Sequence, residues 1–240
     1  ELANKAVAAF SGVAVLILLH VIDEHHAIKF IDFETIMLLF GMMIIVSVLK
    51  HSGLFSIISV RISELTRGNP VKILILFSVV TALMSAFLDN VTTVLIIIPI
   101  IIELTRGLGL DPKKYVLSQA IISNIGGTAT LIGDPPNVII GSKVGLTFNQ
   151  FLFNLSPPVI VIFVVVLAFI WATNRSQFKP INTNIIKLFT VNLLLEKIRH
   201  DFLSIKIDYT LMKKGIFFLM IAILLFITQT ITGLAPGVIA

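Results

Sequence analysis

Two short polar stretches interrupt a strongly apolar chain of 240 residues. They are LDNVTT at 88–93 and SNIGGTATLIGDPPNVII at 123–140, and isoleucine, leucine and valine flank both. Each stretch combines one carboxylate with side-chain amides and hydroxyls. These oxygen-bearing groups bind protons and hard cations, so the two stretches hold the candidates for chemistry in this sequence.

Asp89 and Asp134 are the sharpest candidates within these stretches. An aspartate in apolar surroundings can act as a proton acceptor or as a cation ligand. Each of these residues also directly precedes an apolar helical segment, where an aspartate can serve as the N-cap. The sequence leaves both roles open for both residues.

Neutral polar residues beside the two aspartates are expected to complete an ion- or substrate-binding site. They are Asn90, Thr92 and Thr93 in the first stretch, and Ser123, Asn124, Thr128, Thr130 and Asn137 in the second. Gly126 and Gly127 are expected to permit unwinding there. The same polar side chains could instead cap helix ends or form hydrogen bonds between helices.

The composition places these stretches in a membrane protein. The chain is 57% hydrophobic and only 13% charged, with a mean hydropathy of +1.04. Such a chain has too little polar surface for a soluble domain of this size, which predicts an all-α integral membrane protein. The chain has no cysteine, so it has no disulfide framework and no thiolate metal site.

Unusually short apolar arms lie on either side of LDNVTT. The arms 73–88 and 90–102 would extend roughly 24 and 20 Å as helices, less than the ~30 Å hydrocarbon core. The lengths favour a re-entrant hairpin over 73–105, with LDNVTT at its tip, rather than two complete spans.

The second stretch predicts a broken helix over 115–141. Gly133, Pro135 and Pro136 are unsuited to a continuous helix, and a second half-helix is expected to begin at the proline pair. Non-helical backbone survives in a membrane only where protein or a wet cavity surrounds it. Two interrupted helices with polar residues are therefore typical of a transporter site.

The distribution of lysine and arginine predicts the orientation. Loops 50–72, 103–114 and 173–214 carry most of these residues, which indicates that they are cytoplasmic by the positive-inside rule. We therefore expect a multi-pass protein of the cell membrane with the N-terminus and the loop 173–213 in the cytoplasm.

Three regions follow from this topology. They are a first transmembrane repeat at 1–172, a basic amphipathic linker at 173–213, and a transmembrane helix at 214–240 leading into a second repeat. A weak similarity between ELANKAVAA at 1–9 and GLAPGVIA at 233–240 agrees with an inverted repeat, whose second half is absent from the sequence. The expected partners are the lipid bilayer, a small ion, the second repeat and, if the natural chain stops at residue 240, a second copy.

Other kinds of site are disfavoured. The run Asp23-Glu24-His25-His26 is better explained as a solvated loop than as a metal cluster, because adjacent residues do not converge on one ion. GGTATLIGDPP lacks the Gly-Lys-Ser/Thr ending of a phosphate loop, and the basic residues are explained by orientation rather than by nucleic acid. The spans contain no HExxH motif, so we expect neither an enzyme nor a cofactor beyond a coupling H⁺ or Na⁺.

FLDNVTTVLIIIP at 87–99, SNIGGTATLIGDPPNVII at 123–140 and LLFGMMIIVSVLKHSGLF at 38–55 resemble the ion transporter superfamily. The resemblance is to the citrate-transporter-like branch with arsenite permeases, sodium–proton antiporters and the P protein, and it covers the chain as an N-terminal half. It implies an inverted-repeat fold in which hairpin tip and broken helix meet near the membrane centre. By similarity, Asp89, Asn90, Thr92 and Thr93 match the tip motif, and Ser123, Asn124, Gly126, Gly127, Thr128 and Asn137 match the broken-helix motif.

One departure from related sodium–dicarboxylate carriers bears on the substrate. Those carriers have Ser-Asn-Thr at the tip and threonine where this chain has Asp134. Two carboxylates repel a dicarboxylate unless they are protonated, which favours proton or cation exchange, or a neutral substrate. The predicted function is a proton- or sodium-coupled secondary transporter for ion antiport or efflux of arsenite or another anion. The alternatives are a passive anion channel and sodium-coupled uptake of citrate or a dicarboxylate.

Overall fold

The computed structural model describes residues 4–23, 31–174, 185–203 and 207–240, and these residues contain helices but no strand. The longer helices are α1 (Lys5–Leu18), α3 (Phe33–His51), α4 (Leu54–Thr66), α5 (Pro70–Ser85), α6 (Asn90–Gly107), α7 (Pro112–Gly127), α8 (Pro135–Val144), α9 (Phe148–Thr173), α10 (Ile185–Leu203) and α11 (Tyr209–Ile227). Two single-turn helices, α12 (Gln229–Thr232) and α13 (Pro236–Ile239), follow.

Four of these helices are long and apolar enough to cross a membrane: α3, α6, α9 and α11. The longest is α9, whose 26 residues extend about 39 Å at ~1.5 Å per residue. Several apolar helices of this kind make the chain a multi-pass membrane protein, as the composition predicts.

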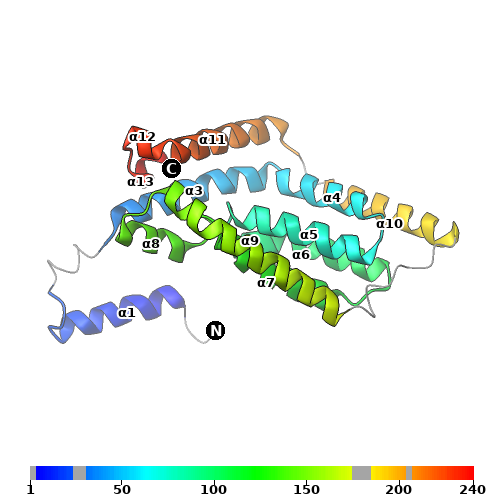
Figure 1. Cartoon of the computed structure of the whole chain (residues 1–240), viewed down its shortest axis with the longest axis horizontal. Coiled ribbons are helices and arrows are strands. Elements are labelled where there is room, and N and C mark those ends of the chain that lie inside the picture. The colour runs from blue at the N-terminus through cyan, green and yellow to red at the C-terminus, as the bar shows by residue number, and fades with distance from the viewer. Residues whose placement is uncertain (1–3, 24–30, 175–184, 204–206) are drawn as a thin grey trace.

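The N-terminal helix α1 stands apart from the other helices (Figure 1). It has 14 residues and ends at Leu18. His20 follows with a positive φ of 53°, which ends the helical run. At ~1.5 Å per residue α1 is about 21 Å long, shorter than the ~30 Å hydrocarbon core.

The helices α5 and α6 lie where the two short apolar arms are predicted, but one of them is longer than expected. α5 has 16 residues, whereas α6 has 18 and continues beyond Ile102 through charged Glu103 and Arg106. The carboxylate of Glu103 accepts a hydrogen bond of 2.8 Å from Lys197 Nζ of α10, which accommodates a charge at this end of the helix. At about 27 Å, α6 approaches the ~30 Å hydrocarbon core, so the length argument for a re-entrant hairpin rests on α5 alone.

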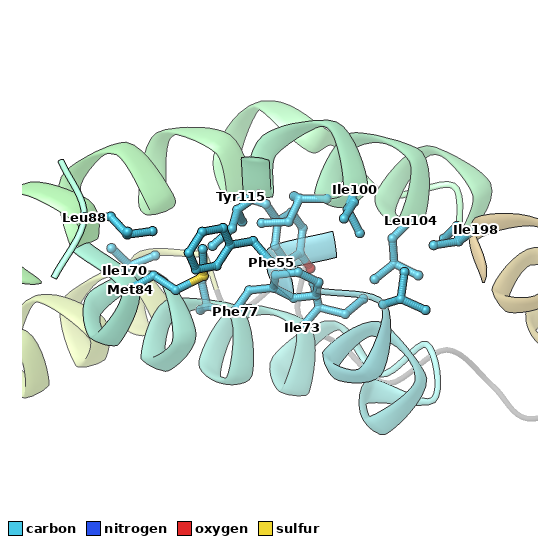
Figure 2. Close-up of a cluster of buried hydrophobic side chains, with 14 of the residues drawn as sticks. Phe55, Ile73, Phe77, Met84, Leu88, Ile100, Leu104, Tyr115, Ile170 and Ile198 are labelled. Carbon is cyan, nitrogen blue, oxygen red and sulfur yellow. The ribbon is translucent and has the colours of Figure 1, made fainter. Parts of the chain in front are cut away.

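Two hydrophobic clusters hold the described helices together. Figure 2 shows the larger one, in which Phe55 of α4, Phe77 of α5, Leu104 of α6 and Tyr115 of α7 meet. α10 contributes Ile198, which is fully buried. The second cluster joins the start of α3 to α8, α9, α11 and α13, and includes Leu38, Met42, Leu131, Ile132, Val138, Phe148, Phe151, Ala222, Phe226 and Ile239.

The polar stretches lie at helix ends in this arrangement. α7 begins at Pro112 after the N-cap Asp111 and ends at Gly127. α8 begins at Pro135, the position that the proline pair predicts, and residues 128–134 between the two helices are not helical. α5 packs closely against α7, which brings the connection between α5 and α6 beside the connection between α7 and α8.

Candidate functional site

Asn90 is the centre of the contact between the two polar connections. Its side-chain Nδ2 donates to Asn124 Oδ1 at 3.1 Å and to Asp134 Oδ2 at 3.2 Å. Its Oδ1 lies 2.7 Å from the hydroxyl of Ser85, which is positioned to donate to it. One amide therefore joins the ends of α5, α6 and α7 to the start of α8.

Ser85 belongs to the site although the sequence analysis did not select it. The side chain is fully buried, and its Oγ also lies 2.7 Å from the main-chain oxygen of Ser123. A signal was available, because Ser78, Thr81 and Ser85 recur at helical spacing in an otherwise apolar segment. That spacing places all three on the face of α5 that contacts α7.

The same face carries a second buried polar layer. Thr81 Oγ1 donates to Gln119 Oε1 at 2.7 Å, and Gln119 Nε2 donates to Ser78 Oγ at 3.4 Å. All three side chains are fully buried. Such hydrogen bonds stabilise contact between apolar helices by roughly 0.6–2 kcal/mol each, so α5 and α7 are expected to stay together as one unit.

The two predicted aspartates differ in their contacts. Asp89 Oδ1 accepts a hydrogen bond of 2.8 Å from the main-chain N–H of Thr92, and therefore caps α6. Asp134 occupies the N-cap position of α8, but its side chain makes no capping bond there. Instead its Oδ2 accepts from Asn90. The alternative that both aspartates are simple N-caps is wrong for Asp134.

The non-helical segment 128–134 is held by side chains at both ends. Asn137 Nδ2 donates to the main-chain oxygens of Gly127 at 3.0 Å and Thr130 at 2.9 Å. The hydroxyl of Thr130 donates to the main-chain oxygen of Ala86 and accepts from Gly133 N–H at 3.1 Å. Asn137 and Thr130 therefore fix the backbone around the site.

The glycines permit close approach rather than unwinding at their own positions. Gly126 and Gly127 lie in the last turn of α7. A Cβ on Gly126 would lie 2.8 Å from the main-chain carbon of Ala82, and one on Gly127 would lie 3.3 Å from Asn90 Cγ. A Cβ on Gly133 would lie 2.9 Å from the main-chain oxygen of Ser85. Larger residues would separate the two connections.

The other predicted site residues fall into two groups. The hydroxyls of Ser123 and Thr128 donate to main-chain oxygens of their own helix, at 3.0 Å and 2.8 Å. Thr93 is fully buried one turn into α6, and its Oγ1 has no hydrogen-bond partner among the described residues. Thr92 contributes its main-chain N–H to the cap. Of these four hydroxyls, that of Thr93 is therefore the best placed to accept a new partner.

The charge of the site is negative. Stretches 88–93 and 123–140 contain Asp89 and Asp134 but no lysine, arginine or histidine. In the part of the chain that the structure describes, no group of three or more His, Cys, Asp or Glu side chains is placed to hold a metal ion. The arrangement is suited to a proton or a monovalent cation bound by carboxylate, amide and hydroxyl oxygens.

A family model described as "Citrate transporter" matches residues 1–240. The chain belongs to the citrate transporter family. The resemblance inferred from the two polar motifs is confirmed, since the match covers both motifs and the remainder of the chain.

The names of several relatives of this member of the citrate transporter family describe them as membrane proteins or transporters. It is 39% identical over 213 residues to a 46 kDa membrane protein of Mycobacterium leprae, covering 87% of the chain and 49% of that protein. It is 42% identical over 169 residues to an uncharacterised transporter of Mycobacterium tuberculosis, and the match covers 69% of the chain and 39% of that transporter. It is also 42% identical over 165 residues to the human P protein, and this match covers 65% of the chain and 20% of the P protein. The chain thus spans less than half the length of each of these three relatives.

Proposed function

We propose that this chain is the N-terminal half of a proton- or sodium-coupled secondary transporter, and not an enzyme. The observation that carries the proposal is the partly buried hydrogen bond between Asn90 and Asp134, which joins two polar helix ends of an apolar helical assembly. The inverted-repeat architecture, with a re-entrant hairpin, a broken helix and a second repeat facing this site, forms part of the proposal. Its support is the family match and the length of the relatives.

Asp134 is the proposed coupling residue. Its carboxylate does not cap a helix, and neither polar stretch supplies a cationic side chain to neutralise it. A proton or Na⁺ would provide that neutralisation, with Asn90 and Asn124 contributing nearby polar atoms. Asp89 has the structural role of holding the first turn of α6.

Alternating access couples the ion to the substrate in this proposal. A negative site binds an anion well only after a proton or cation has reduced the repulsion. Coupling thus follows from electrostatics, and it suits antiport or efflux of an ion such as arsenite. Uptake of citrate or a similar organic anion is the second candidate, because the matching family model is described as a citrate transporter.

Inside-out vesicles from cells that express the gene for this chain provide the test. The measurement is dissipation of a pH gradient on addition of Na⁺, arsenite or citrate, for wild type, Asp134→Asn and Asp89→Asn. We expect Asp134→Asn to abolish the coupled signal and Asp89→Asn to retain most of it, since asparagine also caps helices. Full activity of Asp134→Asn on every substrate would refute the coupling role. Substrate currents that persist without any counter-ion would instead establish a passive channel.

A further inference from the structure

The short helix α8 lies between two connections that are not helical. On its N-terminal side are residues 128–134, and on its C-terminal side is Gly145, whose φ of +71° favours glycine. Asp134 directly precedes the helix. A change in the tilt of α8 would therefore move the carboxylate of Asp134, together with the bonds that Asn137 makes to Gly127 and Thr130.

α8 is also lightly packed. Only Val138 and Gly141 are buried, while Ile139 and Ile140 are half exposed. Its main helical neighbour is α3, and a cavity of about 160 Å³ lies beside this contact. Thr35 and Leu38 of α3 line the cavity together with Val138 and Ser142 of α8. Packing alone therefore holds α8 weakly against α3.

One polar bond crosses this loose contact. The Ser142 hydroxyl near the C-terminal end of α8 donates to Asp32 Oδ2 at the N-cap of α3, across 110 positions of sequence. Asp32 Oδ1 accepts from the main-chain N–H of Thr35 at 3.0 Å. In the described part of the chain, no other side-chain hydrogen bond joins α3 to α8. The bond from Ser142, that from Thr35 and the charge of Lys143 lower the pKa of Asp32, so the carboxylate is an ionised and strong acceptor.

The geometry points to a latch: the Asp32–Ser142 bond holds the far end of α8 against α3, and its release lets α8 tilt about the segment 128–134 and Gly145. The tilt changes the position of Asp134 relative to Asn90. Charged groups at the latch are Asp32 and Glu34 on the α3 side and Lys143 on α8. The latch concerns the motion of one helix, and its test requires no transport.

The absence of cysteine from the chain makes a direct test simple. Val138→Cys places a single thiol on the buried face of α8, at a position that is 2% exposed. The purified chain in lipid nanodiscs is labelled with a water-soluble maleimide, with and without Ser142→Ala or Asp32→Ser. Serine at position 32 still caps α3 but is too short to reach Ser142. We expect either change to raise the labelling rate about two- to fivefold, since the bond is exposed and its loss has the net effect of a single solvent-accessible hydrogen bond.

Matched controls separate latch release from loss of structure. Ser142→Thr keeps the hydroxyl and should leave the rate at the wild-type value. Asp208→Asn alters a capping carboxylate of α11, which accepts from Thr210 and Leu211, and should also have no effect. A thiol at Ile97, fully buried in α6, reports global opening. An unchanged rate in both Ser142→Ala and Asp32→Ser would overturn the latch, as would an equal rise at Ile97→Cys.

Ser142→Ala and Asp32→Ser remove the same hydrogen bond, so their effects on the labelling rate should not add. The double variant Ser142→Ala with Asp32→Ser should label no faster than the faster single variant, because the bond is already absent in each. Multiplied rates in the double variant would mean that the two residues act separately, and the latch would be rejected. Neither result depends on the transport assay with Asp134→Asn.

Discussion

Asn90 and Asp134 lie 44 positions apart in the sequence, yet Asn90 Nδ2 donates to Asp134 Oδ2 at 3.2 Å. The bond connects the first residue of α6 with the residue before α8. The other end of the Asn90 amide, Oδ1, lies 2.7 Å from the Ser85 hydroxyl, which can donate either to it or to the main-chain oxygen of Ser123. One side chain therefore links the connection between α5 and α6 to the start of α8.

These contacts predict a role for Ser85. Ser85→Ala removes the hydroxyl shared by Asn90 Oδ1 and the main-chain oxygen of Ser123, and leaves that buried main-chain oxygen less well satisfied, which costs about 1–3 kcal/mol. We expect a lower unfolding temperature in detergent together with weaker ion-dependent protection against heat. Ser118→Ala is the control, since the Ser118 hydroxyl donates within α7 to the main-chain oxygen of Lys114. Equal unfolding temperatures and equal ion-dependent protection in the two variants would contradict this role of Ser85.

The contact between α5 and α7 predicts a sharp steric limit at Gly126. Gly126→Ala places a Cβ against the backbone of Ala82, which cannot move as a flexible side chain could. Overpacking of this kind costs about 1–3 kcal/mol, or roughly 2–4 °C in Tm per kcal/mol for a chain of this size. The control is Gly12→Ala in α1, where no atom lies within 4 Å of the new Cβ. Thermal unfolding should show a lower Tm for Gly126→Ala than for Gly12→Ala. A wild-type Tm for Gly126→Ala would argue against the close approach of α5 and α7 at this position.

Thr130 and Asn137 are predicted to stabilise the segment 128–134. Thr130→Val removes both a donor to Ala86 and an acceptor for Gly133 N–H at nearly constant volume. Asn137→Leu removes the amide that bonds to Gly127 and Thr130. Each change should raise amide hydrogen exchange in 128–134 while leaving exchange in α9 unchanged. Protection that persists in both variants would show that other contacts hold the segment.

The lowered pKa of Asp32 predicts that the free energy of unfolding depends on pH in the acidic range. Its pKa in the folded chain is lowered, chiefly by the Ser142 hydroxyl, so the folded state binds fewer protons than the unfolded state near pH 4. The stabilisation is therefore complete above the unfolded pKa of ~3.9 and is lost as the pH falls through the lower folded pKa. Unfolding free energy measured from about pH 2 to 5 should rise with pH, and Ser142→Ala should reduce that slope. An identical slope in Ser142→Ala would exclude Ser142 as the cause.

The sequence predicted the helical class and several helix ends because these depend on local chemistry. Asp111 and Pro112 mark the start of α7, and the proline pair marks the start of α8. The length of α6 was predicted wrongly, because a charged residue usually ends an apolar span. Glu103 lies within the helix, and Lys197, 94 positions away, pairs with it at the surface. Local sequence does not reveal such a distant partner.

The site was predictable in its members but not in their roles. The two polar stretches contain Asn90, Asn124 and Asp134, which the structure brings together. Asp89 and Asp134 both precede apolar helices, so the sequence could not show that only Asp89 would cap its helix. That difference depends on the position of Asn90 across the contact. The buried position of Ser85 likewise follows from the packing of α5 against α7.

The proline pair at the start of α8 has a consequence for any anion that approaches Asp134. Pro135 and Pro136 have no amide hydrogen, and the N–H of Asn137 donates to the main-chain oxygen of Asp134. α6 begins without proline, so the amides of Asn90 and Val91 retain hydrogens that point out of the helix start. Main-chain attraction for negative charge is therefore uneven: free amide donors are available at the start of α6, whereas α8 contributes mainly through its dipole.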